Sequence, residues 1–489
     1  MKLRILTFAL ALLLFAGVLC GCRKNTGNEE KATDAFIGEK DYGSVGEKDW
    51  QGRTCQILGV NSLNEPSFEI YADSNEQTNI SMSVFSRNSE IEALFNVEIA
   101  QVGDDDYNDE FYTKFKNKIL TGAVSYDLAF LYRDDMAKAI ENQLFYDLMG
   151  VNYVDFSQPY YNESTLESMK ISGKLFHMVS DFSLVDKNRI AVLFANRTLA
   201  EEFGIPNLVQ EVKDGTWTFE KFEQYVKEVA ADLDGDDQRL YTKDRFGVTI
   251  GAKDESIAFW SAMGAKTVSR NDAGQYEFTY SNQLALNAAD RIKRVFTNED
   301  LYYYSRVEDN YEGAGDAFKA GRSLFYGASL SSITGIKESD FAYTVLPFPK
   351  YDEDQDRYYS NNNNRYCATF GIPTCAQDKD FSGFMIEVLS WKSTQTTLRT
   401  YYQINCKLRN SYDQECSDMM DVLFESLSFD FGFMYDPVFT VENSTPKSIV
   451  STALRHDDGQ SLSTAYESYS ESQEIKLKQL LKKILTTAR

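Results

Sequence analysis

Histidine is scarce in this chain, which has only His177 and His456 among its 489 residues. A hydrolase that depends on a histidine base, or a metal centre built from several histidines, has almost nothing to work with. The sequence also lacks the Gly-x-Ser-x-Gly elbow, the Walker loop and the His-Glu-x-x-His motif. Carboxylates are abundant, so a glycosidase acid/base pair stays open, although no particular pair stands out. We expect His177, in the apparent strand 174–179, to be a half-buried structural residue.

Positive charge is also in short supply. Lysine and arginine number 50 against 74 aspartates and glutamates, which gives a formal net charge of −24. An acidic surface of this kind repels nucleic acid and anionic lipid, and no basic stripe offsets it. Nucleic acid is therefore excluded as a partner.

The cysteines leave the disulfide state open. Beyond the N-terminal pair, Cys55, Cys367, Cys375, Cys406 and Cys416 form an odd set that allows at most two bridges. Local bridges between Cys367 and Cys375 or between Cys406 and Cys416 are compatible with the spacing, and so are buried free thiols. None of the five shows zinc-ligand spacing.

The N-terminus has the pattern of an export signal. Lys2 and Arg4 precede an apolar stretch over residues 5–20 that is too short to span a bilayer. The sequence Leu-Cys-Gly-Cys at its end resembles a bacterial lipobox, which implies cleavage after residue 21 and lipidation of Cys22. A diacylglyceryl group would anchor the chain stably. Residues 22–51 are polar and lack apolar periodicity, so we predict a flexible tether. An ordinary signal peptide without lipidation is the alternative.

From residue 52 onward, predicted strands alternate with predicted helices. Residues 52–61 are expected to form a first strand, and residues 126–132 (YDLAFLY) form a nearly continuous apolar run typical of a strand covered on both faces. Residues 109–120, between these two strands, have the apolar spacing of a helix. Further strands are predicted at residues 175–179 and 189–194. The pattern indicates an α/β fold with mostly parallel sheets. Its length suits two lobes.

Several segments resemble the extracellular solute-binding protein family 1, the maltose-binding-like receptors of ABC importers. Asp214-Gly215-Thr216-Trp217-Thr218 precedes an amphipathic helix and then Asp232-Leu233-Asp234-Gly235-Asp236 with a later Phe-Gly pair. Residues 191–204, 316–326, 341–350 and 400–420 resemble further family segments in the same order. The individual motifs are loose, but together they cover nearly the whole chain after residue 52.

The resemblance implies a type II periplasmic-binding-protein-like fold, in which each lobe is a mostly parallel sheet flanked by helices. Three crossing segments, which we place near residues 181–189, 366–373 and 429–436, would form the hinge. The N-terminal lobe is then predicted to comprise residues 52–185 and 368–430. The C-terminal lobe comprises residues 186–367 and 431–489.

Ligands of open α/β sheets sit beyond the carboxyl ends of the strands, which favours the loops after Val60, Phe130 and Leu324. Arg133 and Asp134 supply a planar fork and a carboxylate that can bind hydroxyl groups, although a solvated helix start capped by Asp134 is equally open. The resemblance also places ligand contacts at residues 132–134 and an aromatic platform for the ligand at Trp260. The alternative for Trp260 is burial in the core. The predicted binding residues are Tyr132, Arg133, Asp134, Trp260, Asn61, Ser62, Tyr326 and Tyr366.

The cluster Asp232, Asp234 and Asp236 has some character of a calcium loop. It lacks the glycine and glutamate that an EF-hand needs at its sixth and twelfth positions, and an acidic solvated turn explains it as well. We therefore predict no metal and no cofactor.

Together these features predict a lipid-anchored, non-enzymatic receptor outside the cell membrane. It would capture a carbohydrate by hinge closure and deliver it, as a monomer, to the membrane subunits of an ABC importer. A receptor for peptides or other polar solutes is the first alternative, and an anchoring pair of charges in the cleft would support it. A secreted glycoside-active enzyme would need two carboxylates facing each other across the cleft. A surface adhesin with a decayed cleft is the third alternative.

Overall fold

Two separate sheets organise the part of the chain that the computed structural model describes, namely residues 43–59, 69–75, 78–103, 110–251, 255–309, 311–337, 339–362, 366–406, 413–454 and 460–486. The first sheet has the strand order β12-β3-β1-β2. Its strands are β1 (Arg53–Leu58), β2 (Val97–Val102), β3 (Leu128–Tyr132) and β12 (Ala368–Gly371). Strand β1 pairs in parallel with β2 and β3, and β12 is antiparallel to β3.

Burial explains why the first sheet has helices on its faces. All five residues of β3 are buried, as its continuous apolar run predicts for a strand with both faces covered. Helix α2 (Asn79–Phe95) packs on β2, and α4 (Arg133–Glu141) packs on β3. Thr78 and Ser81 form a capping box that fixes the start of α2. Helix α14 (Lys379–Ser393) packs against α2, although it lies almost 300 residues later in the chain.

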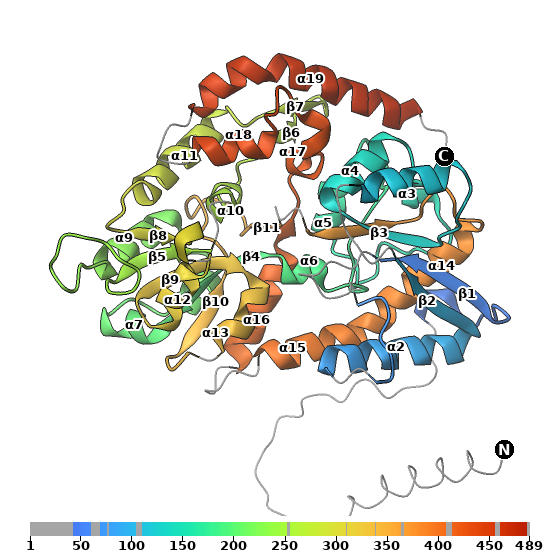
Figure 1. The fold of residues 1–489 in the computed structure, drawn as a ribbon, viewed down its shortest axis with the longest axis horizontal. Helices are drawn as coiled ribbons and strands as arrows, with labels where there is room; N and C mark the ends of the chain where they lie inside the picture. Colours follow the sequence, from blue (N-terminus) through green and yellow to red (C-terminus); the bar gives the residue numbers. More distant parts are fainter. Residues whose placement is uncertain are drawn as a thin grey trace, which may run out of the picture. The chain divides into compact units, whose positions relative to one another are not determined.

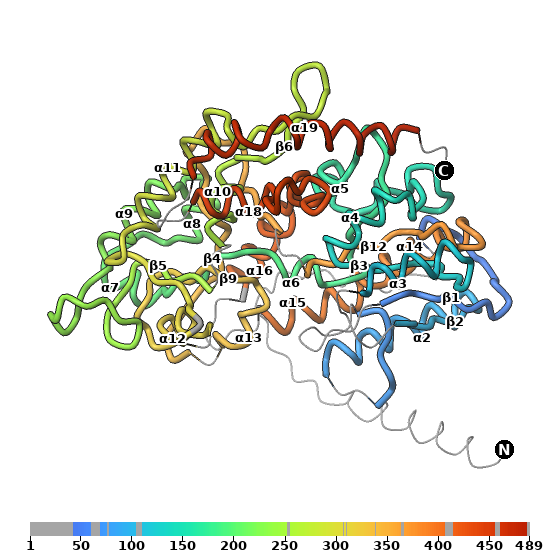
Figure 2. The backbone as a smooth tube through the Cα atoms, turned by 45° about the horizontal axis from the view of Figure 1, so that its top comes forward, coloured from blue at the N-terminus to red at the C-terminus, as the bar shows by residue number. Residues whose placement is uncertain are grey.

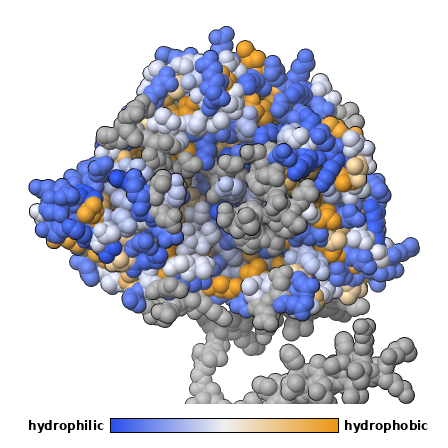
Figure 3. Space-filling view, in the orientation of Figure 1, coloured by the Kyte–Doolittle hydropathy of each residue, from blue (hydrophilic) through white to orange (hydrophobic). Residues whose placement is uncertain are grey.

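The second sheet has the order β10-β4-β9-β5-β8 and occupies the left side of Figure 1. Its strands are β4 (Ala191–Asn196), β5 (Phe246–Ile250), β8 (Tyr302–Tyr304), β9 (Ser323–Ser329) and β10 (Tyr343–Leu346). Strand β5 is parallel to β8 and β9, whereas β4 is antiparallel to β9 and β10. Each sheet with its helices is one lobe. The face drawn in Figure 3 is mainly hydrophilic and is hollowed near its middle.

Helix α9 (Phe219–Val229) covers the second sheet at very close range. A Cβ atom at Gly247 of β5 would lie 2.3 Å from the carbonyl oxygen of Val226, so only glycine permits this approach. Trp217, from the Gly-x-Trp-Thr motif, is fully buried and donates its indole N–H to the carbonyl of Pro347 at 3.0 Å. The motif therefore serves the core of the second lobe, and α9 begins after Thr218 as expected.

The chain crosses between the lobes more than once. Helix α6 (Val185–Asn188) leads into β4, and β11 (Ser360–Asn361) pairs with β13 (Leu427–Ser428). Helix α15 (Arg399–Cys406) contacts α2 of the first lobe, but the following α16 (Asp413–Glu425) packs on β10 of the second. The sequence assigned α16 to the first lobe. Its contact with β10 places it on the other one, with Met419, Met420 and Leu423 buried. The local pattern shows that a helix has an apolar face but not which sheet covers that face.

The C-terminal region joins both lobes. It consists of α17 (Phe431–Met434), η6 (Asp436–Phe439), α18 (Pro446–Ala453) and α19 (Leu462–Thr486). Helix α19 contacts α4 of the first lobe and β7 (Tyr276–Phe278), and it runs along the upper edge in Figures 1 and 2. Within the described ranges, no helix is both long enough and apolar enough to cross a bilayer.

The remaining elements are short or lie outside the sheets. The helices are α3 (Phe111–Leu120), α5 (Glu163–Met169), α7 (Arg197–Glu202), α8 (Leu208–Lys213), α10 (Glu255–Ala262), α11 (Gln283–Phe296), α12 (Gly313–Lys319) and α13 (Ile333–Ile336). Strand β6 (Val268–Arg270) pairs with β7. The short turns are η1 (Gly43–Val45), η2 (Leu148–Gly150), η3 (Val307–Asp309), η4 (Leu330–Ser332) and the π-helical η5 (Thr394–Leu398).

The segment 175–179 differs from its predicted strand. Only Met178 makes a bridge, to Phe370, and the segment is otherwise irregular. His177 is fully buried rather than half-buried, with Nδ1 2.9 Å from the Thr369 hydroxyl. Burial lowers its pKa to about 3, so the imidazole stays neutral and structural.

The cysteine side chains that the structure describes, those of Cys55, Cys367, Cys375 and Cys416, form no disulfide bridge. This excludes both local disulfides that the spacing allowed. His456 and Cys22 lie outside the described residues.

Candidate functional site

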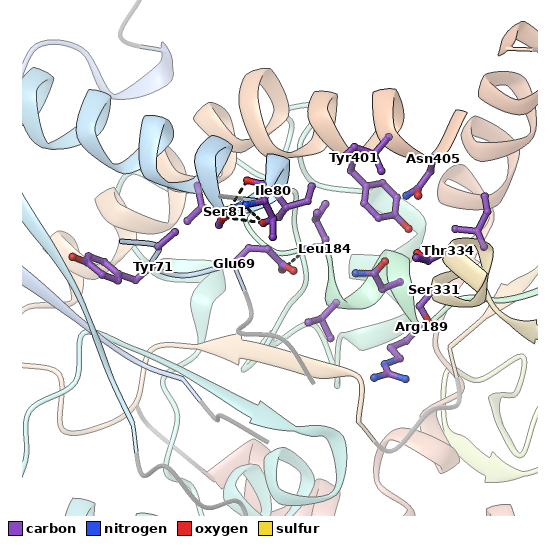
Figure 4. A pocket seen from close by; sticks show the side chains of 17 residues that line it. Glu69, Tyr71, Ile80, Ser81, Leu184, Arg189, Ser331, Thr334, Tyr401 and Asn405 are labelled. Carbon is purple, nitrogen blue, oxygen red and sulfur yellow. Dashed lines mark hydrogen bonds between the residues drawn. The ribbon is translucent and has the colours of Figure 1, made fainter. Parts of the chain in front are cut away.

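A cavity of about 740 Å³ lies between the two lobes, which we call the main cavity. The first lobe contributes residues 69–72 and the start of α2, and the second contributes η4 and α13, which follow the carboxyl end of β9. The hinge helix α6 and helix α15 complete the walls. This is where open α/β folds bind ligands, beyond the carboxyl ends of their strands. Figure 4 labels ten of the lining residues: Glu69, Tyr71, Ile80, Ser81, Leu184, Arg189, Ser331, Thr334, Tyr401 and Asn405.

The lining combines apolar surface with polar groups that have different hydrogen-bonding roles. Tyr401 and Asn405 reach into the main cavity from α15, and Ser331 and Thr334 come from the second lobe (Figure 4). Tyr71 is 44% exposed, and its ring is turned away from the other labelled side chains in Figure 4, so the aromatic ring that reaches the cavity is that of Tyr401. Aromatic faces bind the C–H faces of sugar rings, and hydroxyls and amides bind sugar hydroxyls. The arrangement suits a polar solute that also has apolar faces.

Glu69 ties the wall of the first lobe to the hinge. Its Oε2 accepts hydrogen bonds from the Leu184 amide at 2.9 Å and the Ser183 hydroxyl at 3.2 Å. The residue is only 6% exposed, and burial raises its pKa from 4.5 to about 7 despite these bonds. The carboxyl group of Glu69 is therefore able to be protonated near neutral pH.

Behind Glu69, the fully buried Arg87 clamps three segments together. Its guanidinium donates to the carbonyls of Glu69 (2.7 Å), Ile70 (3.0 Å) and Phe182 (3.2 Å), and to the Ser393 hydroxyl (3.1 Å). Burial lowers the pKa of Arg87 to about 9, which Glu69 opposes. Arg87 thus holds the wall of the main cavity in place without lining it.

Arg189 brings a second charged group to the main cavity, at the end of the hinge helix. It lies close enough to Tyr366 and Cys367 for their charges to affect its pKa, which burial lowers. The Tyr366 ring, 37% exposed, packs edge-on against Tyr132 with centroids 5.5 Å apart. Arg189 therefore links the main cavity to the predicted group after β3.

In that group, Tyr132 and Arg133 are buried and Asp134 is partly exposed. The Arg133 guanidinium pairs with the Asp134 carboxylate at 2.9 Å, and Tyr132, not Asp134, occupies the N-cap position of α4. Burial raises the pKa of Asp436 to about 6, and the positive charge of Arg133 opposes this shift. The structure brings Tyr132, Arg133 and Tyr366 together beside the main cavity, although none of them lines it.

Trp260 is fully buried and donates its indole N–H to the carbonyl of Ala285 at 3.0 Å. Its ring is enclosed in the core, so it offers no face to a solute in this structure. Tyr326 stacks on Phe194 and Phe318 in the second lobe, and burial raises its pKa to about 12. Asn61 and Ser62 lie outside the described residues.

The carboxylates that lie close together at the acidic loop are not the three that the sequence suggested. Ligand atoms of Asp232, Asp234 and Asp244 lie within 4.8 Å of one another, whereas Asp236 accepts from the Lys243 ammonium at 3.1 Å. The same ammonium lies 2.8 Å from Asp234. The prediction of no metal stays a prediction, and in the structure Asp244 takes the place of Asp236 among the oxygens of this weak calcium candidate that lie close enough to share an ion.

Glu69, Arg189, Tyr401 and Asn405 were not identified from the sequence. Arg189 carried a usable signal, since it ends a predicted hinge segment and begins an apolar strand. The other three come from segments more than 300 residues apart, and only the fold shows that they share a cavity.

Comparison with family models found no match, and none of the curated proteins matches the chain. Solved structures match in shape. The sugar-binding protein MalE from Xanthomonas citri is 13% identical, with a TM-score of 0.56 over 87% of this chain and 98% of that one. ABC substrate-binding protein Lmo0181 from Listeria monocytogenes, solved with cycloalternan, is also 13% identical, with a TM-score of 0.53 over 87% and 99%.

UgpB from Mycobacterium tuberculosis, solved with glycerophosphocholine, is 15% identical, with a TM-score of 0.53 over 81% and 95%. These likenesses define the class of fold: the chain has the two-lobed α/β fold of ABC substrate-binding proteins. The fold expected from the sequence is confirmed. Because one of these neighbours was solved with a ligand that is not a sugar, the fold by itself does not fix the class of ligand.

Proposed function

We propose that this protein is a non-enzymatic solute receptor that binds an oligosaccharide in the main cavity and delivers it to an ABC importer. The observation that carries the proposal is the main cavity itself. Its walls are formed by residues of both lobes and of the hinge. Receptors of this architecture close around their ligand by hinge bending, in which a few loop residues absorb the motion. The hydrogen bonds that Glu69 accepts from Ser183 and Leu184 connect one wall directly to such a segment.

A carbohydrate suits the cavity because its walls offer the Tyr401 ring together with hydroxyl, amide and guanidinium groups. The solved structures with this fold support the same class, since several of those proteins were solved with sugars such as cycloalternan and maltotriose. A volume of about 740 Å³ lies in the range of about 300–1,000 Å³ that is typical of small-molecule sites.

The charges Glu69 and Arg189 support the alternative of a peptide or another polar zwitterion, which an anchoring pair of opposite charges would orient. The enzyme alternative has less support. It needs two facing carboxylates, and Glu69 is the only acidic side chain among the described residues that line the main cavity.

For its location, the proposal relies on the N-terminal sequence. The lipobox resemblance at Cys22 implies a lipid anchor on the outer face of the cell membrane, with a tether to the folded body. The receptor would act as a monomer, with the membrane subunits of the importer as its partners.

The test is a thermal-shift and calorimetric screen of the protein against oligosaccharides, with dipeptides and calcium as parallel arms. A ligand at a hundred times its dissociation constant stabilises the fold by about 2.7 kcal/mol. We expect an oligosaccharide to raise the melting temperature without any cleavage product. Arg189→Met should weaken its affinity at least about tenfold, the loss of about 1.4 kcal/mol that one charge-assisted hydrogen bond supplies. Arg306→Met, at an exposed arginine outside the cavity, is the matched control.

Binding of dipeptides but no oligosaccharide would replace the sugar by the peptide alternative. Release of shortened sugars would support the enzyme. Equal affinity of the Arg189→Met variant and the control would move the binding site away from the main cavity.

A further inference from the structure

A second cavity, of about 460 Å³, shares no lining residue with the main cavity. Helix α5 forms one wall, the end of α10 with residues 265 and 266 forms another, and residues 357–361 and 428–430 complete it. Its volume is far larger than the roughly 30 Å³ that one water molecule occupies in the liquid. The second cavity therefore has room for a small molecule.

Three side chains that line the second cavity each have a buried polar atom without a hydrogen-bond partner among the described residues. These atoms are the Ser261 hydroxyl, the Asn361 side-chain carbonyl and the Ser164 hydroxyl. Ser261 is 4% exposed and Asn361 is 6% exposed, so bulk water does not reach them freely. Because buried polar groups almost always have partners, these three atoms indicate a guest that both donates and accepts hydrogen bonds.

Four of the five charged side chains around the second cavity balance in sign. Glu163 and Glu167 on α5 face Lys266 and Arg357 on the opposite walls. The fifth charged residue, Asp430, has its carboxylate occupied by two donors of Thr267 and by the Phe433 amide. The five side chains therefore sum to one negative charge, which disfavours an anionic guest, so a neutral guest is favoured over an anionic one.

Two aromatic side chains, Tyr359 and Phe429, add apolar surface to this polar lining. The Arg357 guanidinium lies over the Tyr359 ring, 4.9 Å from its centroid, which holds that ring in place. A guest with hydroxyl groups and exposed C–H faces would match both kinds of lining.

The second cavity is connected to the hinge through β11. Asn361 lines the cavity, and the next residue, Asn362, donates its side-chain amide to the carbonyl of Asp186 in α6 at 2.8 Å. Successive side chains of an extended segment point to opposite faces. The second cavity and the hinge helix, whose end lines the main cavity, therefore contact opposite faces of the same crossing segment.

We propose that the second cavity is a binding site for a small neutral polyhydroxylated molecule, a monosaccharide or a polyol, held by Ser261, Asn361 and Ser164. This inference is independent of the ligand proposed for the main cavity.

Calorimetry on the full-length protein tests it, with D-glucose and glycerol as the two neutral probes and D-glucuronate as the charged one. We expect at least one neutral probe to bind, more tightly than D-glucuronate. Ser261→Ala removes an unpartnered hydroxyl with almost no change in shape, so it should fold normally and weaken the bound neutral probe about tenfold. Asn361→Leu should abolish the binding, and Ser261→Ala keeps the test valid if that second variant does not fold.

Arg189→Met, which alters the main cavity, should leave the affinity of the neutral probe unchanged. Conversely, Ser261→Ala should leave oligosaccharide binding in the main cavity unchanged, so failure of one proposal is distinguishable from failure of the other. No binding of either neutral probe would overturn the inference and leave a cavity filled by water. Preference for D-glucuronate, or loss of probe binding in Arg189→Met with retention in Ser261→Ala, would also overturn it.

Discussion

Replacing Glu69 by glutamine should make the protein more stable above about pH 4.5, with nearly all of the gain present at neutral pH. Burial raises the pKa of Glu69 from 4.5 to about 7. Because this folded-state pKa exceeds the unfolded one, folding favours the protonated form. The contribution of Glu69 to stability is therefore fully present below about pH 4.5 and is lost as the pH rises through about 7.

At about 1.4 kcal/mol per pKa unit, the shift corresponds to about 3 kcal/mol. Glutamine stays neutral, and its carbonyl oxygen can still accept from Ser183 and Leu184. The free energy of unfolding of Glu69→Gln relative to the wild type should thus rise by about 3 kcal/mol between about pH 4.5 and pH 8. For a compact unit of about 450 residues the unfolding entropy is about 1 kcal/mol per degree, so the melting temperature should differ by about 3 °C at pH 8.

The assay is denaturation of both proteins at a series of pH values, with Glu202→Gln as a control at an exposed carboxylate of α7. A difference between Glu69→Gln and the wild type that stays constant with pH would refute the reasoning. The same would follow if Glu202→Gln showed the same pH dependence.

Three further variants test the packing around the site. Arg87→Met removes the donor to five oxygens, of which the Ile70 carbonyl keeps the Asn88 amide, so we expect a loss of about 4 kcal/mol in chemical denaturation. Lys392→Met at a partly exposed position should cost less than about 1 kcal/mol. Trp260→Phe should lower the free energy of unfolding by about 2 kcal/mol in thermal denaturation and leave the solute affinity unchanged in calorimetry. A large loss of affinity would show that Trp260 contributes to the binding site. Gly247→Ala forces α9 away from β5, and we expect little folded protein by circular dichroism, whereas Gly235→Ala in the exposed acidic loop should fold.

The fold could be predicted because its signals are local in the sequence. The continuous apolar run of β3 and the amphipathic spacing of α9 each depend on a few neighbouring residues, and both elements form where expected. The Gly-x-Trp-Thr motif was also informative, since Trp217 fixes the loop before α9 by its bond to Pro347. What the local pattern could not determine was the sheet that each later helix covers, as α16 shows.

The binding site was harder to predict because burial decides which polar residues face a solute, and burial depends on contacts between distant segments. Trp260 and Tyr401 are both aromatic residues on helices. The sequence around them does not reveal that the Trp260 ring is enclosed by the core whereas the Tyr401 ring reaches the main cavity. Glu69 is equally inconspicuous in the sequence. It becomes important only because Arg87 holds its backbone and the hinge supplies its hydrogen bonds, which sets its pKa. The Glu69 carboxyl group joins the wall of the main cavity to the hinge, and it titrates near neutral pH. The pH dependence of stability therefore reports on the geometry of the site before any ligand is known.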